Sequence, residues 1–216
     1  MTGCVSWRKN HLESCSPGKA VIWLDCDISF PASALSEINK SIDLVKGKYF
    51  VITPQLVRMW DETWDCLVHK DFREKELGYC YDYDVSLIEK ISQQNSHHLD
   101  KITEFKFAGG WLTVISSDLL KLTGIPEVFK PYGEEDTYIM QVCEGLKKLG
   151  WPVSQYVMEG LLVAQKFNVF ESAKKQFKIV NDKSADAAYN KTIKSAYVDD
   201  TLSHIGRYNG TWRAGQ

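Results

Sequence analysis

The sequence predicts an α/β fold in one domain, or one domain with a modest extension, over its 216 residues. Two observations carry this prediction. Short apolar runs of strand length alternate with segments in which apolar residues recur at helical spacing, and glycine or proline stands at the junctions between them. Hydrophobic residues make up 44% of the chain and charged residues 25%, which is an ordinary globular mix and excludes wholesale disorder or a fibrous repeat.

The first part of the fold is expected to be strand, helix, strand. The continuous apolar run Ala20–Leu24 follows the turn signal Ser16-Pro-Gly18, which indicates a buried strand. A helix follows from apolar residues at helical spacing: Leu35, Ile38, Ile42 and Val45. Gly47 stops this pattern before the next apolar run, Tyr49–Ile52. Beyond it, Val57, Trp60, Trp64 and Leu67 suggest a further amphipathic helix, and residues 70–84 a loop.

The second part alternates in the same way. Phe105–Phe107 and Trp111–Ile115 predict two strands around a glycine kink. A short helix is expected over Ser117–Leu122. The segment Glu134–Leu149 has a 3.6-residue apolar period, with acids in its first turn and lysines in its last, which predicts a helix. Val153–Ala164 predicts a strand or a strand pair.

The C-terminal segment differs in composition from the rest. Glu171–Asp200 is rich in lysine and small residues, so we expect a surface helix or a partly mobile segment. The chain is therefore divided into a domain of residues 1–168 and a helical or extended tail of residues 169–216.

Composition excludes several classes of function. The net charge of −2, from 26 basic and 28 acidic residues, offers no bulk attraction to nucleic acid. No run of 18 apolar residues and no signal-peptide block in Met1–Lys19 are found, so we expect a cytoplasmic protein without a membrane span. The six cysteines form no Cys-x-x-Cys pair and are expected to be free thiols. Association into a homo-oligomer stays open.

The sharpest local feature is Asp25-Cys-Asp27 at the end of a predicted buried strand. Because strand side chains alternate, both carboxylates face the same side, about 7 Å apart at the backbone. Hard divalent ions prefer carboxylate oxygens, so the pair suits a Mn²⁺ or Mg²⁺ ion that bridges a diphosphate. A polar strand end that leads into a turn is the competing interpretation.

Two further segments carry polar or flexible groups suited to a ligand. Gly109 and Gly110 let the backbone approach a ligand, and the indole of Trp111 can pack on a sugar face. Gly133-Glu-Glu-Asp136 begins the best-patterned helix, where a carboxylate can act as a general base. A core tryptophan beside a bulge, and acids that merely stabilise a helix start, are the plainer alternatives.

In this order, the three features resemble the catalytic half of metal-dependent GT-A glycosyltransferases of the family 2 and β-1,4-galactosyltransferase types. The matching segments are Phe107–Pro126 and Tyr132–Ile139, within a resemblance that spans Lys19–Ala164. The fold it implies is a Rossmann-like mixed sheet flanked by helices. It lacks the first nucleotide-binding strand-helix-strand units, because only Met1–Lys19 precedes the Asp-x-Asp strand.

The resemblance also implies a role for each matched residue. Asp25 and Asp27 would hold the metal, with Asp27 the direct ligand and Asp25 nearer the ribose. Asp136 would be the catalytic base, and Glu135 would hydrogen-bond a substrate hydroxyl. The remaining implied contacts are with donor or acceptor for Gly109, Gly110, Trp111 and Glu134, and with the metal for His204.

The implied activity is transfer of a sugar from a nucleotide-diphosphate sugar, expected to be a uridine diphosphate sugar, to a carbohydrate or other hydroxyl acceptor with inversion. Some retaining mannosyltransferases share the Asp-x-Asp spelling, so the stereochemistry stays open. Two other hypotheses remain. One is a non-catalytic sugar- or partner-binding remnant of a transferase. The other is a haloacid-dehalogenase-like phosphatase with Asp199-Asp200 as its later acidic motif.

Overall fold

The computed structural model describes residues 16–25, 28–58, 98–103, 112–131, 133–165 and 169–213. Within these ranges the predicted α/β fold is confirmed. The strands are β1 (Ala20–Leu24), β2 (Ile28–Ser29), β3 (Tyr49–Arg58), β4 (His98–Ile102), β5 (Leu112–Ser116) and β6 (Val153–Gln165). The helices are α2 (Ala34–Leu44), α4 (Ser117–Thr123), α5 (Glu135–Lys148) and α6 (Val169–Arg213).

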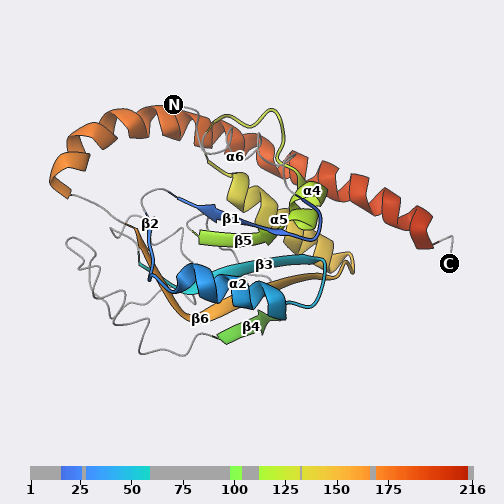
Figure 1. Cartoon of the computed structure of the whole chain (residues 1–216). Coiled ribbons are helices and arrows are strands. Elements are labelled where there is room, and N and C mark those ends of the chain that lie inside the picture. Colours follow the sequence, from blue (N-terminus) through green and yellow to red (C-terminus); the bar gives the residue numbers. More distant parts are fainter. Residues whose placement is uncertain are drawn as a thin grey trace.

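One mixed sheet joins all the strands (Figure 1). Its order is β1-β5-β3-β6-β2, and β4 also pairs with β6. Strands β3 and β6 run parallel, whereas β1 and β3 pair antiparallel with β5, and β2 and β4 antiparallel with β6. Antiparallel pairing returns the chain to the end of the sheet it came from, so motifs distant in sequence can meet at one end.

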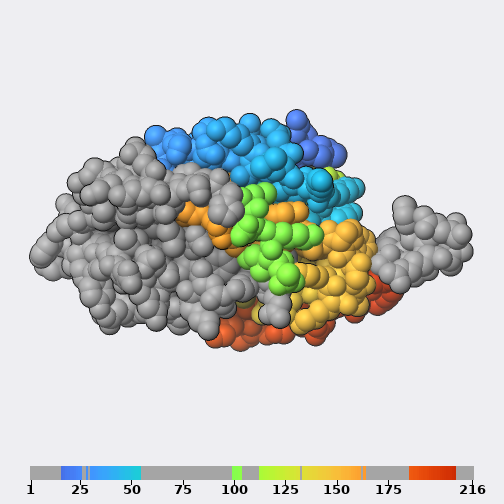
Figure 2. Space-filling view, turned by 90° about the horizontal axis from the view of Figure 1, so that it is seen from below, coloured from blue at the N-terminus to red at the C-terminus, as the bar shows by residue number. Residues whose placement is uncertain are grey.

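Helices cover both faces of the sheet, and a separate core lies under each cover. On one face, Ile38 of α2 packs in a cluster with Ile52 and Val114. On the other face, α4, α5 and α6 form a second cluster with Trp23, Val51 and Ile115 of the sheet. In Figure 2 the blue surface of α2 and the red surface of α6 lie at opposite margins of the view, with the green strand β4 between them.

One strand prediction is confirmed and one needs a correction. Of the two forms expected for Val153–Ala164, the structure has the single strand β6, in which a bulge absorbs the irregularity: Pro54 is opposite Met158, but Leu56 is opposite Leu162. Gly160 supplies the positive φ of 77° that this bulge requires. The helix expected from Val57 onward is wrong at its start, since pairing with β6 extends β3 to Arg58. The rest of that prediction, the loop at 70–84 and the strand Phe105–Phe107 lie outside the described residues.

The helix predictions are confirmed where they rest on local signals. α2, α4 and α5 lie at the predicted positions. Ser116 caps α4, because its Oγ accepts the amide of Leu119 at 3.3 Å. Gly150, with φ of 83°, follows the end of α5.

The C-terminal segment is helical, as expected, but its described side chains are not confined to the surface. α6 spans 45 residues, and its side chains Val198 and Ile205 belong to the same core as α5. At Gly145 of α5, the side chain of Leu202 packs directly on the helix backbone. Among the described residues, no helix is both long and apolar enough to cross a membrane.

Candidate active site

Asp25 lies directly after β1, at the point where the chain leaves the sheet. Its carbonyl oxygen accepts the amide of Ile28 at 3.2 Å, which turns the chain toward β2. Its side chain is half-buried. Asp27, the expected direct metal ligand, lies outside the described residues.

Antiparallel pairing brings the end of β1 beside the start of β5. Leu24 is the register partner of Leu112, so Asp25 emerges where the chain enters β5. The predicted ligand-binding residues Gly109, Gly110 and Trp111 directly precede Leu112 in sequence and lie outside the described residues. We call this end of the sheet, where β1 finishes at Leu24 and β5 begins at Leu112, the Asp25 end.

The acidic turn, Gly133–Asp136, lies at the start of α5. Gly133 and Glu134 are both left-handed, with φ of 84° and 72°. Glu135 is 4% exposed. Asp136 is half-buried, and its Oδ1 accepts the amide of Thr137 at 2.7 Å. That amide has no partner within the helix, so the carboxylate both stabilises the first turn and is held by it.

The acidic turn points toward the Asp25 end, as the direction of α5 shows. α5 is followed within a few residues by β6, whose first residue Val153 is opposite Tyr49, the first residue of β3. The last residue of β5 lies at this same end of the sheet, since Ser116 Oγ accepts the amide of Phe50 at 3.2 Å. The C-terminus of α5 therefore lies at the end of the sheet away from Asp25. Its 14 residues span about 21 Å, enough to return along the sheet, as Figure 1 shows.

Two residues of α6, Asn190 and Lys194, contact the acidic turn. The ammonium of Lys194 forms an ion pair with the carboxylate of Glu134. The amide of Asn190 bonds to the backbone of Lys130 and Gly133. Sequence reasoning missed both residues, although a signal exists. They belong to a helical stripe, spaced by three and four residues, whose other members are Ala187, Val198, Thr201 and Ile205.

His204, the expected additional metal ligand, is exposed on α6 and lies elsewhere. It comes two residues after Leu202, which contacts Gly145 in the C-terminal half of α5. Asp136 is at the opposite end of that helix. Within the described part of the chain, no group of three His, Cys, Asp or Glu side chains is arranged to hold a metal ion. The structure thus brings Asp25 and the acidic turn to one end of the sheet, and does not bring His204 there.

Comparison with protein-family models and with curated proteins finds no significant match to this chain.

Proposed function

We propose that this chain is a metal-dependent glycosyltransferase, with the catalytic half of a GT-A fold, that transfers a sugar from a nucleotide-diphosphate sugar to an acceptor hydroxyl with inversion. The observation that carries the proposal is that two acidic segments, over a hundred residues apart in sequence, both lie toward one end of the sheet. Asp25 reaches that end through the pairing of Leu24 with Leu112. The acidic turn reaches it through the direction of α5.

The roles follow from the chemistry of sugar transfer. The acceptor oxygen attacks the anomeric carbon, the bond from that carbon to the diphosphate oxygen breaks, and the hydroxyl proton passes to Asp136. Asp25 and Asp27 are suited to hold Mn²⁺ or Mg²⁺, which supplies charge neutralisation at the departing diphosphate. The half-buried setting of Asp136 and its hydrogen bond to Thr137 keep the carboxylate in one orientation, which proximity catalysis requires.

Binding is tested by titrating uridine diphosphate into the protein with and without Mn²⁺, using calorimetry. We expect nucleotide binding that depends on the metal. In Asp27→Asn the metal-dependent affinity for the nucleotide should fall by more than about tenfold. Mutation of residues that only hydrogen-bond to a metal ligand already lowers metal affinity by about that factor. The matched control is Asp43→Asn, which changes an exposed carboxylate on α2 and should bind like the wild type. Equal nucleotide binding with and without the metal would contradict the proposed metal site.

Turnover is tested with a panel of nucleotide sugars and acceptors by following release of the nucleoside diphosphate. Asp136→Asn should lower kcat by about 10²- to 10⁴-fold, because it removes the general base. Its affinity for uridine diphosphate with Mn²⁺ should stay that of the wild type. If Asp136→Asn keeps the wild-type kcat, Asp136 is not the base.

The two alternative hypotheses give different results in the same assays. A phosphatase would release phosphate from monoesters, but its later acidic motif, Asp199-Asp200, is exposed within α6, a placement that does not favour that function. A non-catalytic remnant would bind a sugar or a partner without metal-linked nucleotide binding and without turnover.

A further inference from the structure

Asn190 is a fully buried amide whose polar atoms bind the loop before α5. Its Oδ1 accepts the amide of Lys130 at 2.7 Å. Its Nδ2 donates to the carbonyl oxygens of Lys130 at 3.2 Å and Gly133 at 2.8 Å. Because the side chain is 0% exposed, no water can replace these bonds, and losing one leaves a buried polar group unsatisfied. One side chain therefore fixes both ends of the segment 130–133.

Lys194 lies one helical turn further along α6 and is also buried, at 7% exposed. Its ammonium pairs with the carboxylate of Glu134. Among the described residues, Glu134 is the one non-glycine residue with positive φ. Such a conformation persists only where the surroundings over-determine it, and an ion pair with the buried Lys194 is a contact of that kind.

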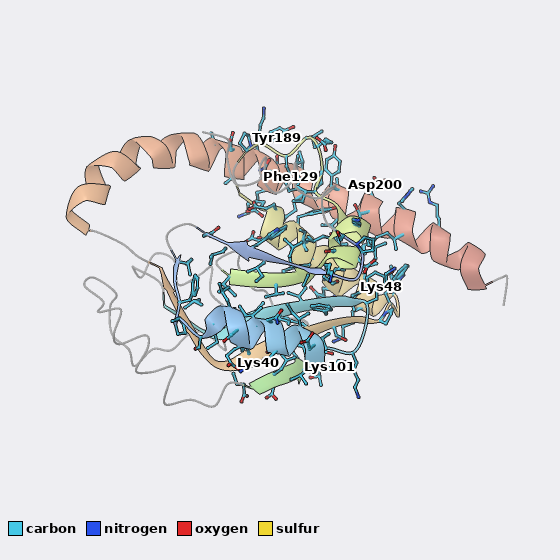
Figure 3. The ribbon with its side chains drawn as sticks, viewed as in Figure 1. Lys40, Lys48, Lys101, Phe129, Tyr189 and Asp200 are labelled. Carbon is cyan, nitrogen blue, oxygen red and sulfur yellow. The ribbon has the colours of Figure 1, made fainter. Side chains whose placement is uncertain are left out.

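Aromatic contacts hold the same loop against α6. Lys130 Nζ lies 5.3 Å from the centre of the Tyr189 ring. The ring of Phe129 meets Tyr138 edge-on at 5.5 Å and Tyr197 at 6.4 Å between ring centroids. Figure 3 shows Tyr189 on α6, with Phe129 close to it in this view. The loop is thus held by contacts with α6 and, through Tyr138, with α5.

These contacts end one residue before Glu135 and two before Asp136. Gly133 and Glu134 both take left-handed backbone, so their torsions set the direction in which α5 begins. There is little room to shift them, because a Cβ at Gly133 would lie 3.0 Å from Cβ of Ala187. We propose that Asn190 and Lys194 are positioning residues that orient the acidic turn, and through it Asp136.

The kinetic part of this inference rests on the proposed function, whereas the contacts themselves do not. A displacement of a reacting group by about 1 Å can lower a rate about 10²-fold even when the mutation lies away from the chemistry. Loss of the Lys194 ion pair should therefore lower kcat. It should leave the KM for the nucleotide sugar unchanged, since that substrate is expected to bind at Asp25 and Asp27.

The test compares three variants in the turnover assay. Lys194→Met keeps the aliphatic stem but removes the charge, and should lower kcat about 10- to 100-fold at unchanged KM. Lys194→Arg keeps the cation and should restore kcat toward the wild-type value. The matched control, Lys191→Met, alters an exposed lysine three residues earlier on α6 and should leave kcat unchanged. A merely structural role would give no separation of kcat from KM and no rescue by arginine, and either result overturns the inference.

Lys194→Met leaves Glu134 as a half-buried carboxylate without its partner, which destabilises the protein. If too little of it folds for kinetics, Lys194→Gln replaces it, since glutamine keeps a donor without the charge. Lys194→Gln should again lower kcat at unchanged KM, and a wild-type kcat would overturn the inference.

A second measurement does not depend on activity. Asn190→Asp keeps the acceptor for the amide of Lys130. It replaces the Nδ2 donor by a carboxylate oxygen, which then faces the carbonyl oxygens of Lys130 and Gly133. Hydrogen exchange at the amides of Thr137 and Tyr138, which bond to Asp136 Oδ1 and to the carbonyl oxygen of Glu134, should accelerate, while exchange in β5 stays that of the wild type. Unchanged exchange at Thr137 and Tyr138 would overturn the inference. Absence of turnover in the wild type, with the exchange result as expected, would overturn the proposed function and leave the holding of the loop by α6 supported.

Discussion

Asp118 connects three separate segments through one carboxylate. Its Oδ2 accepts the amide of Gly18 at 3.0 Å, and its Oδ1 lies 3.3 Å from Lys48 Nζ. The hydrogen bond from Gly18, followed by the contact with Lys48, lowers the pKa of the Asp118 carboxyl below its usual value. This carboxylate therefore holds the turn before β1 and the start of β3 against α4, at the end of the sheet opposite Asp25.

Asp118→Ala should lower the free energy of unfolding by about 1 kcal/mol at neutral pH, the usual value of such a bond. The folded-state pKa is the lower one, so the stabilisation is present above pH 3.8 and is lost as the pH falls further, through the lowered pKa. Urea denaturation of both proteins from neutral pH down to the acid range measures this. A stability difference that stays constant below pH 3.8 would contradict the assignment.

At the scale of elements, α5 and α6 pack closely because α5 has a glycine at their contact. A Cβ at Gly145 would lie 2.9 Å from Cδ2 of Leu202, and closer still to Cδ1. In an isolated helix, alanine would be favoured over glycine by about 1 kcal/mol. The glycine thus has a packing reason, which is the close approach of α6 to the backbone of α5.

This contact can be measured with a double-mutant cycle of Gly145→Ala and Leu202→Ala. Gly145→Ala alone should change the free energy of unfolding by less than about 1 kcal/mol, because the methyl groups of the half-buried Leu202 side chain can rotate away, at a cost that offsets the gain in helix propensity. In the Leu202→Ala background the same change should be neutral or stabilising. Thermal or urea unfolding of the four proteins gives the coupling energy. Additive effects of the two changes would show that the helices are further apart than described.

At the scale of the whole molecule, α6 is part of the domain core. Val198 and Ile205 share a cluster with Trp23 of β1 and Leu146 of α5. Tyr138 of α5 connects these layers, because its hydroxyl lies 3.1 Å from the carbonyl oxygen of Thr123 and 2.8 Å from Thr201 Oγ1. Burial raises the pKa of this phenol, so it remains a neutral hydrogen-bonding group at physiological pH.

A shared core predicts that α6 and the sheet open together. In native-state hydrogen exchange, the amides of residues 190–205 should exchange with the same free energy as those of β5 and of the middle of α5. Both sets should respond to low urea with the same slope, because they open by the same global event. Exchange of α6 at a clearly lower free energy would mean that it undocks alone, and would weaken its proposed role in holding the acidic turn.

The elements that local patterns define were predictable, namely β1, α2, α4 and α5, because the spacing of their apolar residues and their glycine stops lie within a few residues. The extent of β3 and the bulge in β6 were not, since both depend on pairing between strands a hundred residues apart. The same distinction holds for the site. Asp25, Glu135 and Asp136 stood out by type and position, whereas Asn190 and Lys194 acquire meaning only from contacts 57 to 60 residues away in sequence.

The amino-acid sequence by itself determined which segments are helix or strand and which of them carry acids at their ends, because backbone preference and side-chain periodicity are local. The tertiary structure alone decided that β1 lies beside β5, that α5 returns its first turn to the Asp25 end, and that α6 holds that turn. These outcomes depend on which buried surfaces fit together, and the free energy of burial is a property of pairs of distant segments.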